Sequence, residues 1–254
     1  MLQIAKRTTV GLIVLLAMPV TVWMSGWHWQ PGGTDYILKA LFAMTETVTS
    51  PWGALTSIVL AGWFLWCLRF RIKATVILFI ILTITVVVGQ QIKSTIKNWV
   101  QEPRPYVMWL EGEHNVDVKA FYSLKRGARG DLVTEQLQNE TRIPQWLKGH
   151  WAFETGFAFP SGHTMFVATW ALLAFGLLLP RRRYISTLVI SIWAISVMGS
   201  RLVLGMHWPQ DLIVATLISW VLVTISCALV QRFCGSLDIS APESQEIKQR
   251  TEDE

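Results

Sequence analysis

The stretch from Ser200 to Asp211 holds residue types that can do chemistry, at a spacing that would bring them together. It supplies a fixed positive charge at Arg201, an imidazole at His207 and a carboxylate four residues later at Asp211. Pro209 suits the first turn of a helix, so His207 should lie just before a helix and Asp211 in its first turn. Asp211 could then accept a hydrogen bond from one ring nitrogen and leave the other free to act as a nucleophile.

The same residues also have a structural explanation. A carboxylate at a helix start is favoured by the helix dipole alone. Arg201 could be an anchor at a membrane surface. The stretch by itself therefore leaves both interpretations open, and the rest of the chain has to decide between them.

Two further polar clusters could join this stretch. The first contains the cations Lys97 and Arg104, and the second contains Ser161, Gly162 and His163. The second cluster adds a hydroxyl, an imidazole and backbone N–H groups at a helix start, where a glycine lets the backbone approach an anion. Three cations and a helix N-terminus together form a site suited to phosphate.

These residues have structural explanations too when each is taken alone. Lys97 and Arg104 could be interfacial anchors, Ser161 could cap a helix, and His163 could be an interfacial histidine. Their gathering on one face of a membrane would be harder to explain in this way.

The composition indicates an integral membrane protein. The 254 residues are 52% hydrophobic and only 15% charged, whereas soluble domains are about 25% charged. Fourteen tryptophans fit a protein with membrane interfaces. The net charge of +5 does not require nucleic acid as a partner, because the basic residues cluster in short loops beside apolar runs.

Cys67, Cys227 and Cys234 lie in or just after apolar runs, which predicts neither a disulfide nor a metal site.

Six apolar runs have the length and character of membrane helices. They cover about residues 8–24, 53–68, 74–93, 162–179, 184–202 and 209–231. The first run could instead be a signal peptide, but no good cleavage site follows it. Trp23, Trp27 and Trp29 resemble an interface belt. We therefore expect a first helix that is retained.

The predicted fold is an all-α integral membrane protein with six transmembrane helices and a small, partly helical cap. The membrane domain should cover residues 1–235. The cap should cover about residues 98–160, a segment small for an independent core. Residues 236–254 are polar and acidic at the end, which is typical of a disordered tail.

The basic loops predict the orientation of these helices. Six spans place both termini on one side, and the clustered basic residues fall on that side, which is then the cytoplasm. They are Lys6, Arg7, residues 69–73, residues 181–183 and Arg232. The cap and all three polar clusters fall on the opposite side. Because the basic loops alone predict this topology, the convergence of the three clusters is an independent observation.

The three clusters resemble the three signature motifs of the type 2 phosphatidic acid phosphatase (PAP2) superfamily. All three match without a departure and in the right order, over somewhat under half of the chain. The matches are Lys97, six residues and Arg104-Pro105; Pro160-Ser161-Gly162-His163; and Ser200-Arg201, five residues, His207, three residues and Asp211.

The resemblance implies a role for each residue. His207 would attack phosphorus and form a phosphohistidine, Asp211 would hold its ring, and His163 would protonate the leaving alkoxide and then activate water. Five residues would bind the phosphate oxygens: Lys97, Arg104, Ser161, Gly162 and Arg201. Fixed cations can replace the metal ions used elsewhere for phosphoryl transfer, so we expect no metal and no other cofactor.

The resemblance also implies a lipid phosphate phosphatase of the bacterial inner membrane, with its active site facing the periplasm and both termini in the cytoplasm. We expect a monomer that meets the bilayer and a lipid substrate but no nucleic acid. Candidate substrates are phosphatidylglycerol phosphate, phosphatidic acid, lysophosphatidic acid, diacylglycerol pyrophosphate and undecaprenyl pyrophosphate, and the residues do not choose among them.

Three other functions could use parts of the same pattern. A lipid transporter or scramblase could place charges at membrane depth, but here the polar groups gather at one face and no inverted repeat is present. A phosphotransferase could use the same phosphohistidine, and only acceptor assays separate it from a phosphatase. The superfamily also includes soluble vanadate-dependent haloperoxidases, and six apolar runs argue against that activity.

Overall fold

The chain forms a bundle of long helices with a group of short helices at one end. The computed structural model describes residues 1–32 and 35–237, and within them every regular element is a helix. The predicted all-α class is therefore confirmed for the described part of the chain. The predicted disordered tail lies outside the described residues from position 238 onward.

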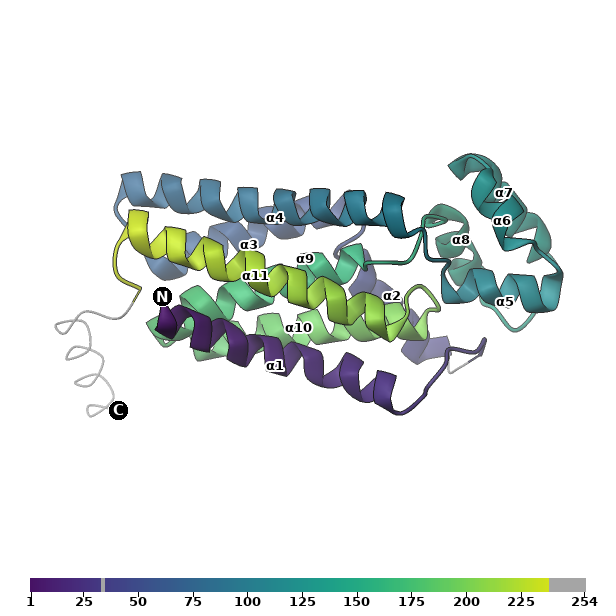
Figure 1. Cartoon of the computed structure of the whole chain (residues 1–254), viewed down its shortest axis with the longest axis horizontal. Helices are drawn as coiled ribbons and strands as arrows, with labels where there is room; N and C mark the ends of the chain where they lie inside the picture. Colours follow the sequence, from purple (N-terminus) through teal and green to yellow (C-terminus); the bar gives the residue numbers. More distant parts are fainter. Residues whose placement is uncertain (33–34, 238–254) are drawn as a thin grey trace.

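The long helices run side by side along the bundle (Figure 1). They are α1 (Leu2–Met24), α3 (Trp52–Leu68), α4 (Ile72–Val100), α9 (Gly162–Leu173), α10 (Tyr184–Val203) and α11 (Pro209–Cys234). The described part of α2 (Asp35–Glu46) packs against α10. The N-terminus and the end of α11 lie together at the end of the bundle away from the short helices (Figure 1).

Five of the six predicted spans are long and apolar enough to cross a membrane. They are Leu2–Met24, Ile72–His114, Gly162–Arg181, Tyr184–Val203 and Pro209–Cys234. The sixth, α3, is a shorter apolar helix of 17 residues that lies beside α4. At 1.5 Å per residue it would reach about 26 Å, against a hydrocarbon core of about 30 Å. That α3 crosses the membrane therefore stays a prediction.

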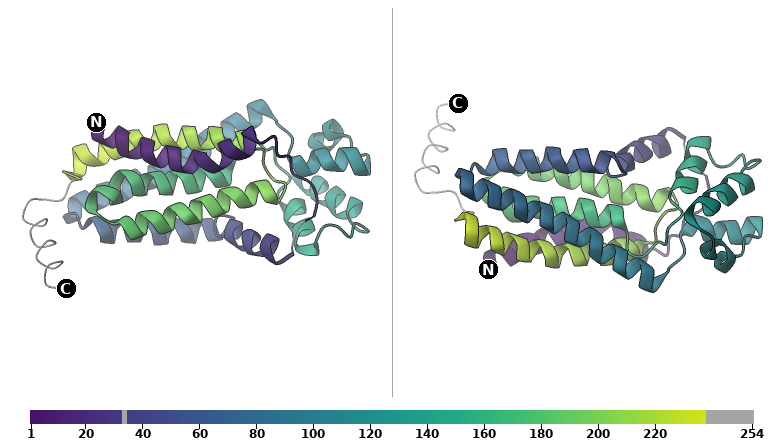
Figure 2. Two further views of the ribbon diagram at one scale, coloured as in Figure 1. Left: turned by 90° about the horizontal axis from the view of Figure 1, so that it is seen from below. Right: turned by 90° about the horizontal axis from the view of Figure 1, so that it is seen from above.

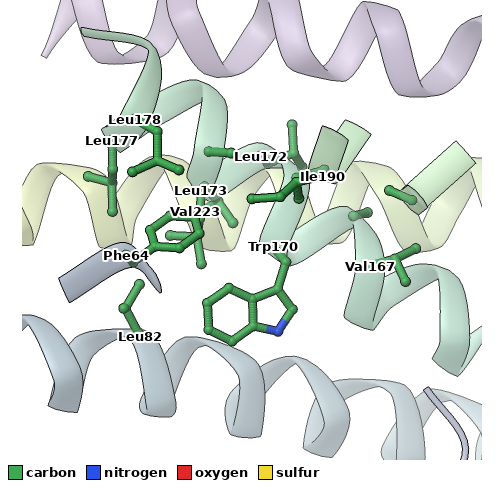
Figure 3. Close-up of a cluster of buried hydrophobic side chains, with 14 of the residues drawn as sticks. Phe64, Leu82, Val167, Trp170, Leu172, Leu173, Leu177, Leu178, Ile190 and Val223 are labelled. Carbon is green, nitrogen blue, oxygen red and sulfur yellow. The ribbon is translucent and has the colours of Figure 1, made fainter. Parts of the chain in front are cut away.

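The middle of the bundle is α9, which contacts α4, α10 and α11. All its residues from Thr164 to Leu173 are buried. Figure 3 shows side chains of α9 and the following turn meeting Phe64 of α3, Leu82 of α4 and Val223 of α11. Because lipid is as apolar as these side chains, close van der Waals packing around α9 is the main force that holds the membrane helices together. It also fixes the N-terminal end of α9, where His163 lies.

The helical path changes at the end of α9. A π-helical turn (η1, Ala174–Leu178) and a 3₁₀ turn (η2, Leu179–Arg181) follow it, where the sequence predicted a plain helix to about residue 179. A side chain at Gly176 would collide with Sγ of Cys227 on α11. The glycine therefore allows this turn to lie directly against α11.

The short helices form the cap: α5 (Pro105–His114), α6 (Val118–Ser123), α7 (Arg126–Gln136) and α8 (Gln145–Phe153). They project beyond one end of the bundle (Figure 2). The helical character of the cap is thus as predicted, although α4 continues to Val100, past the expected end of the third span and start of the cap.

The cap has its own apolar cluster, which includes Tyr106, Phe121 and Trp151. The segment is too small for an independent core, and the bundle completes it with Leu204 and Met206 from the loop after α10. Nε1 of Trp151 donates to the Leu204 carbonyl at 2.9 Å. The cap therefore packs on the loop that carries His207.

The contact between Gly176 and Cys227 yields the first prediction. Gly176→Ala should destabilise the protein by roughly 1–3 kcal/mol, because overpacking a tight contact costs about that much. Replacing Cys227 by Ala in the same chain should recover most of the loss. Thermal denaturation of the two single variants and the double variant in detergent checks this. A Gly176→Ala protein as stable as the unaltered one would contradict the close contact.

Candidate active site

The N-terminal turn of α11 joins His207 to Asp211. Trp208 is the N-cap and Pro209 the first helical residue, so Asp211 falls in the first turn. Nδ1 of His207 lies 3.0 Å from Oδ2 of Asp211. The same oxygen accepts the backbone N–H of Trp208 at 2.9 Å. Both side chains are buried, and the carboxylate orients the imidazole as the spacing predicts.

Arg201 lies in the last turn of α10 and is completely buried. Its Nη2 donates to Oε2 of Glu154 at 2.7 Å, and its Nη1 donates to Oγ1 of Thr45 at 2.9 Å. An arginine that snorkels to a membrane surface would expose its guanidinium. Arg201 therefore has no exposed anchoring role and points into the polar cluster.

Arg104 and Lys97 also point inward. Arg104, the N-cap of α5, donates from Nη1 to Oε2 of Glu154 at 3.2 Å and from Nε to the Gly156 carbonyl at 2.6 Å. Lys97, in the last turn of α4, donates from Nζ to the carbonyls of Phe157 and Ala158. Both cations hold the segment that leads from the cap into α9.

The start of α9 carries the second predicted cluster. The Ser161 hydroxyl accepts the Thr164 N–H at 3.3 Å, so it caps the helix. The Ser161 N–H donates to the Asp211 carbonyl at 3.3 Å. A Cβ at Gly162 would lie 2.8 Å from Cδ of Lys93, so the glycine leaves room for this lysine beside the helix start.

His163 follows in the first turn of α9. Its Nε2 lies 3.2 Å from Oγ1 of Thr49 and 3.6 Å from Oε1 of Glu154. The imidazole is thus held between the segment after α2 and the carboxylate that also binds both arginines.

Glu154 is the central residue of the site that the sequence did not reveal. Its carboxylate contacts Arg104, Arg201 and His163, which come from three different motifs. Burial raises the pKa of this carboxyl, but Arg201, His163 and Arg104 outweigh that effect and hold the pKa well below its usual range. Glu154 is therefore ionised and neutralises part of a strongly positive site.

Two imidazoles near this carboxylate stay neutral. Burial, and then the charges of Arg104, Lys97 and Arg201, hold the pKa of His207 well below its usual range. Burial and Arg201 lower the pKa of His150 to about 3, so its Nε2 can accept from Nη1 of Arg201 at 3.2 Å. A neutral His207 keeps the ring lone pair that a nucleophile needs.

A cavity of about 750 Å³ brings most of these residues to one space. It is lined by Lys97, Arg104, Gly162, His163 and His207 among the predicted site residues. The other three predicted residues, Ser161, Arg201 and Asp211, lie behind this lining. The described residues include no group of three His, Cys, Asp or Glu side chains placed to hold a metal ion.

Lys93 and Glu154 also line the cavity, and no motif used in the sequence analysis contains either residue. Lys93 could have been suspected because it lies one helical turn before Lys97 on the same face. Glu154 had no such signal, since it is one acid among several in a polar segment of mixed charge.

Comparison with known proteins places these residues in a family context. The family model described as the PAP2 superfamily matches residues 74–233. The chain is 60% identical over 253 residues to phosphatidylglycerophosphatase B of Escherichia coli (strain K12), covering 100% of both chains. It is 31% identical over 235 residues to phosphatidylglycerophosphatase B of Haemophilus influenzae, covering 89% of this chain and 96% of that one.

The ionised Glu154 predicts a specific pH dependence of stability. Its folded pKa lies below the ordinary value of 4.5, so the unfolded chain takes up the proton first as pH falls. The contribution is complete above about pH 4.5 and is lost at lower pH. Glu154→Gln should therefore lower the melting temperature at pH 7 and weaken the dependence of stability on pH below 4.5.

The cost of this substitution should be large, because removing one partner of a buried ion pair costs roughly 3–5 kcal/mol. The matched control is Glu113→Gln, which breaks the exposed contact of Glu113 with Arg142 at 2.8 Å and should cost less than about 1 kcal/mol. Equal losses for the two variants in thermal denaturation at pH 7 would contradict the assignment.

Proposed function

The chain belongs to the PAP2 superfamily, and from this premise we propose that it is a membrane phosphatase that removes the terminal phosphate from lipids. The observation that carries the proposal is the His207–Asp211 pair, whose imidazole faces a cavity that Lys97, Arg104 and His163 also line. A phosphate in this cavity would meet a neutral imidazole, fixed cations and a second imidazole. These are the parts that phosphoryl transfer through a covalent intermediate needs.

The proposed reaction has two displacements. In the first, Nε2 of His207 attacks phosphorus, the bond to the lipid oxygen breaks, and His163 gives that oxygen a proton. Asp211 stabilises the positive charge that develops on the ring of His207. In the second, His163 takes a proton from water, the water oxygen attacks phosphorus, and the N–P bond breaks to release inorganic phosphate.

The proposed phosphate ligands are Lys97, Arg104, Ser161, Gly162 and Arg201. In the ligand-free protein both arginines bind Glu154, so a phosphate would compete with that carboxylate for their donors. Ser161 would also have to exchange its present partners, because its hydroxyl and its N–H are both in use.

A second cavity supports a lipid as the substrate. It has a volume of about 280 Å³, is lined mainly by apolar side chains of α3 and α4, and shares Ala54, Ser57 and Val86 with the main cavity. Ile58 and Val87 line it and are 68% and 51% exposed on the outer surface of the bundle. An acyl chain in this second cavity would reach the bilayer sideways while the phosphate lies near His207.

We propose phosphatidylglycerol phosphate as one substrate, since phosphatidylglycerophosphatase B relatives are similar to this chain over nearly all of their length. Phosphatidic acid, lysophosphatidic acid, diacylglycerol pyrophosphate and undecaprenyl pyrophosphate offer the same terminal phosphate and complete the proposed set. We further propose a metal-independent, monomeric enzyme of the bacterial inner membrane, with residues 1–235 as its membrane domain and its active site on the periplasmic side.

Release of inorganic phosphate from this set of lipids by detergent-solubilised protein tests the activity, and a lipid carrier would release none.

The two histidines should respond differently to the leaving group. A lipid alkoxide needs a proton to leave, and such proton transfer is worth about 10²–10⁴ in rate, whereas nitrophenolate leaves without one. His207→Ala should therefore lose activity on both a lipid phosphate and nitrophenyl phosphate. His163→Ala should lose far more activity on the lipid than on the nitrophenyl ester.

Gel filtration in detergent must first show that both histidine variants fold. If His163→Ala loses the same factor on both substrates while His207→Ala keeps turnover that depends on the leaving group, the two roles are reversed.

The orientation in the membrane gives a separate prediction. Asn139 and Arg182 are both exposed, one in the cap and the other in the loop between η2 and α10. Asn139→Cys and Arg182→Cys are placed in a chain whose three native cysteines have been replaced, and intact spheroplasts are treated with an impermeant thiol reagent. The positive-inside rule predicts labelling of Asn139→Cys only. Labelling of Arg182→Cys alone would reverse the topology.

A further inference from the structure

The segment from Phe153 to Ala158 is held by four cationic side chains through its backbone carbonyls. Two of these cations, Arg104 and Lys97, belong to the family motif. The other two, Arg126 and Arg129, come from the first turn of α7 in the cap and belong to none of the motifs. Nη2 of Arg126 donates to Phe153 O at 2.9 Å, and Nη1 of Arg129 donates to Thr155 O at 3.0 Å.

Arg126 and Arg129 both line the cavity that contains His207. They are three residues apart, which places them on one face of α7. Like charges at this spacing repel each other, so an isolated helix would gain nothing from the pair. The pair therefore concentrates positive charge at this part of the cavity wall.

Neither arginine has an acidic partner among the described residues: the guanidinium of Arg126 lies over the ring of Phe153 at 5.0 Å and that of Arg129 over the ring of Tyr122 at 5.6 Å, and both residues line the cavity. Arg142, elsewhere in the cap, is different, because it binds Glu113 at 2.8 Å and Glu140 at 2.7 Å. Arg129 is partly buried, and its Nε has no hydrogen-bond partner in the described chain. A guanidinium has five N–H donors, so each arginine of α7 keeps donors for a ligand.

The two arginines of α7 lie next to the proposed site of the scissile phosphate. Arg104 binds both Glu154 and Gly156, and Arg129 binds Thr155, the residue between them. The Cα atoms of consecutive residues are about 3.8 Å apart. A ligand whose first phosphate lies between Arg104 and His207 could thus place a second anionic group near Arg129. Unpaired arginines in a cavity suit phosphate oxygens in particular, because a guanidinium can bind two of them at once.

We propose that Arg126 and Arg129 form a second anion subsite, which binds the phosphate of the substrate that is not released from the lipid. This proposal rests on the proposed lipid phosphatase function and predicts a preference, within the proposed set of substrates, for lipids with two phosphates. The second phosphate can be joined directly to the first, as in a lipid diphosphate, or separated from it by a glycerol, as in phosphatidylglycerol phosphate. The subsite makes such lipids better substrates than lipids with one phosphate.

The test compares three lipids at matched surface concentration in detergent micelles: phosphatidic acid, diacylglycerol pyrophosphate and phosphatidylglycerol phosphate. The variants are Arg126→Gln, Arg129→Gln and the double variant. Lys125→Gln is the matched control, because Lys125 is exposed, precedes Arg126 and does not line the cavity. It removes the same charge from nearly the same place.

The double variant should lower kcat/KM for a two-phosphate lipid, relative to phosphatidic acid, by about ten- to a hundredfold, the usual value of charge-assisted hydrogen bonds. The loss should lie mainly in KM, since the second phosphate is bound alike before and during the reaction. Arg126→Lys and Arg129→Lys, which keep the charge but lose the planar fork, should fall in between. The control variant should leave the ratio unchanged.

The outcome also identifies the source of the second phosphate. A loss confined to the pyrophosphate points to directly joined phosphates, and a loss confined to phosphatidylglycerol phosphate points to the separated pair. Equal losses on all three lipids would overturn the proposal and leave both arginines as supports for the segment from Phe153 to Ala158. If the unaltered protein releases phosphate from none of the three, the proposed function itself fails.

Discussion

The structure of the site depends on the need to neutralise a buried arginine. Arg201 is completely buried, and a buried charge without a partner is very costly. Its principal partner, Glu154, comes from the end of the cap and also binds Arg104. Separating the cap from the bundle would therefore break the ion pair between Glu154 and Arg201 and leave Arg201 without its acidic partner. One carboxylate thus ties together motifs that are about a hundred residues apart in the sequence.

The helix bundle holds the residues of this charge cluster in place. The central helix α9 is buried on all sides, so the position of His163 follows from the packing of apolar side chains. The loop that carries His207 is held by the cap through Trp151. Groups that must stabilise a developing charge work best when they are already fixed before the reaction. The contacts of the ligand-free protein provide such fixation for His207, whereas under the proposed function the arginines would exchange Glu154 for the substrate phosphate.

Much of this arrangement could be predicted, because local spacing and apolar periodicity determine it. The distance in sequence between His207 and Asp211 placed both at one helix start, and the apolar runs marked most ends of the long helices to within three residues. The first run misses the start of α1 at Leu2, the third misses the end of α4 at Val100, and no apolar run marked α2. Glu154 could not be predicted, since only the folded cap brings this acid to the arginines. The π-helical turn after α9 was also missed, because no pattern in the sequence marks it, and its close contact with Cys227 at Gly176 joins residues far apart in the sequence. The sequence does show that the apolar run of α3 is short. That α3 crosses the membrane therefore stays a prediction.

The central claim is that His207 is the nucleophile, and covalent labelling tests it most directly. The His163→Ala variant, in which water activation is impaired, is mixed with a lipid carrying a radiolabelled terminal phosphate and quenched in alkali, where phosphohistidine survives. Peptide mapping should find the label on His207. Label on another residue, or release of labelled phosphate with no labelled protein at any time, would contradict the account.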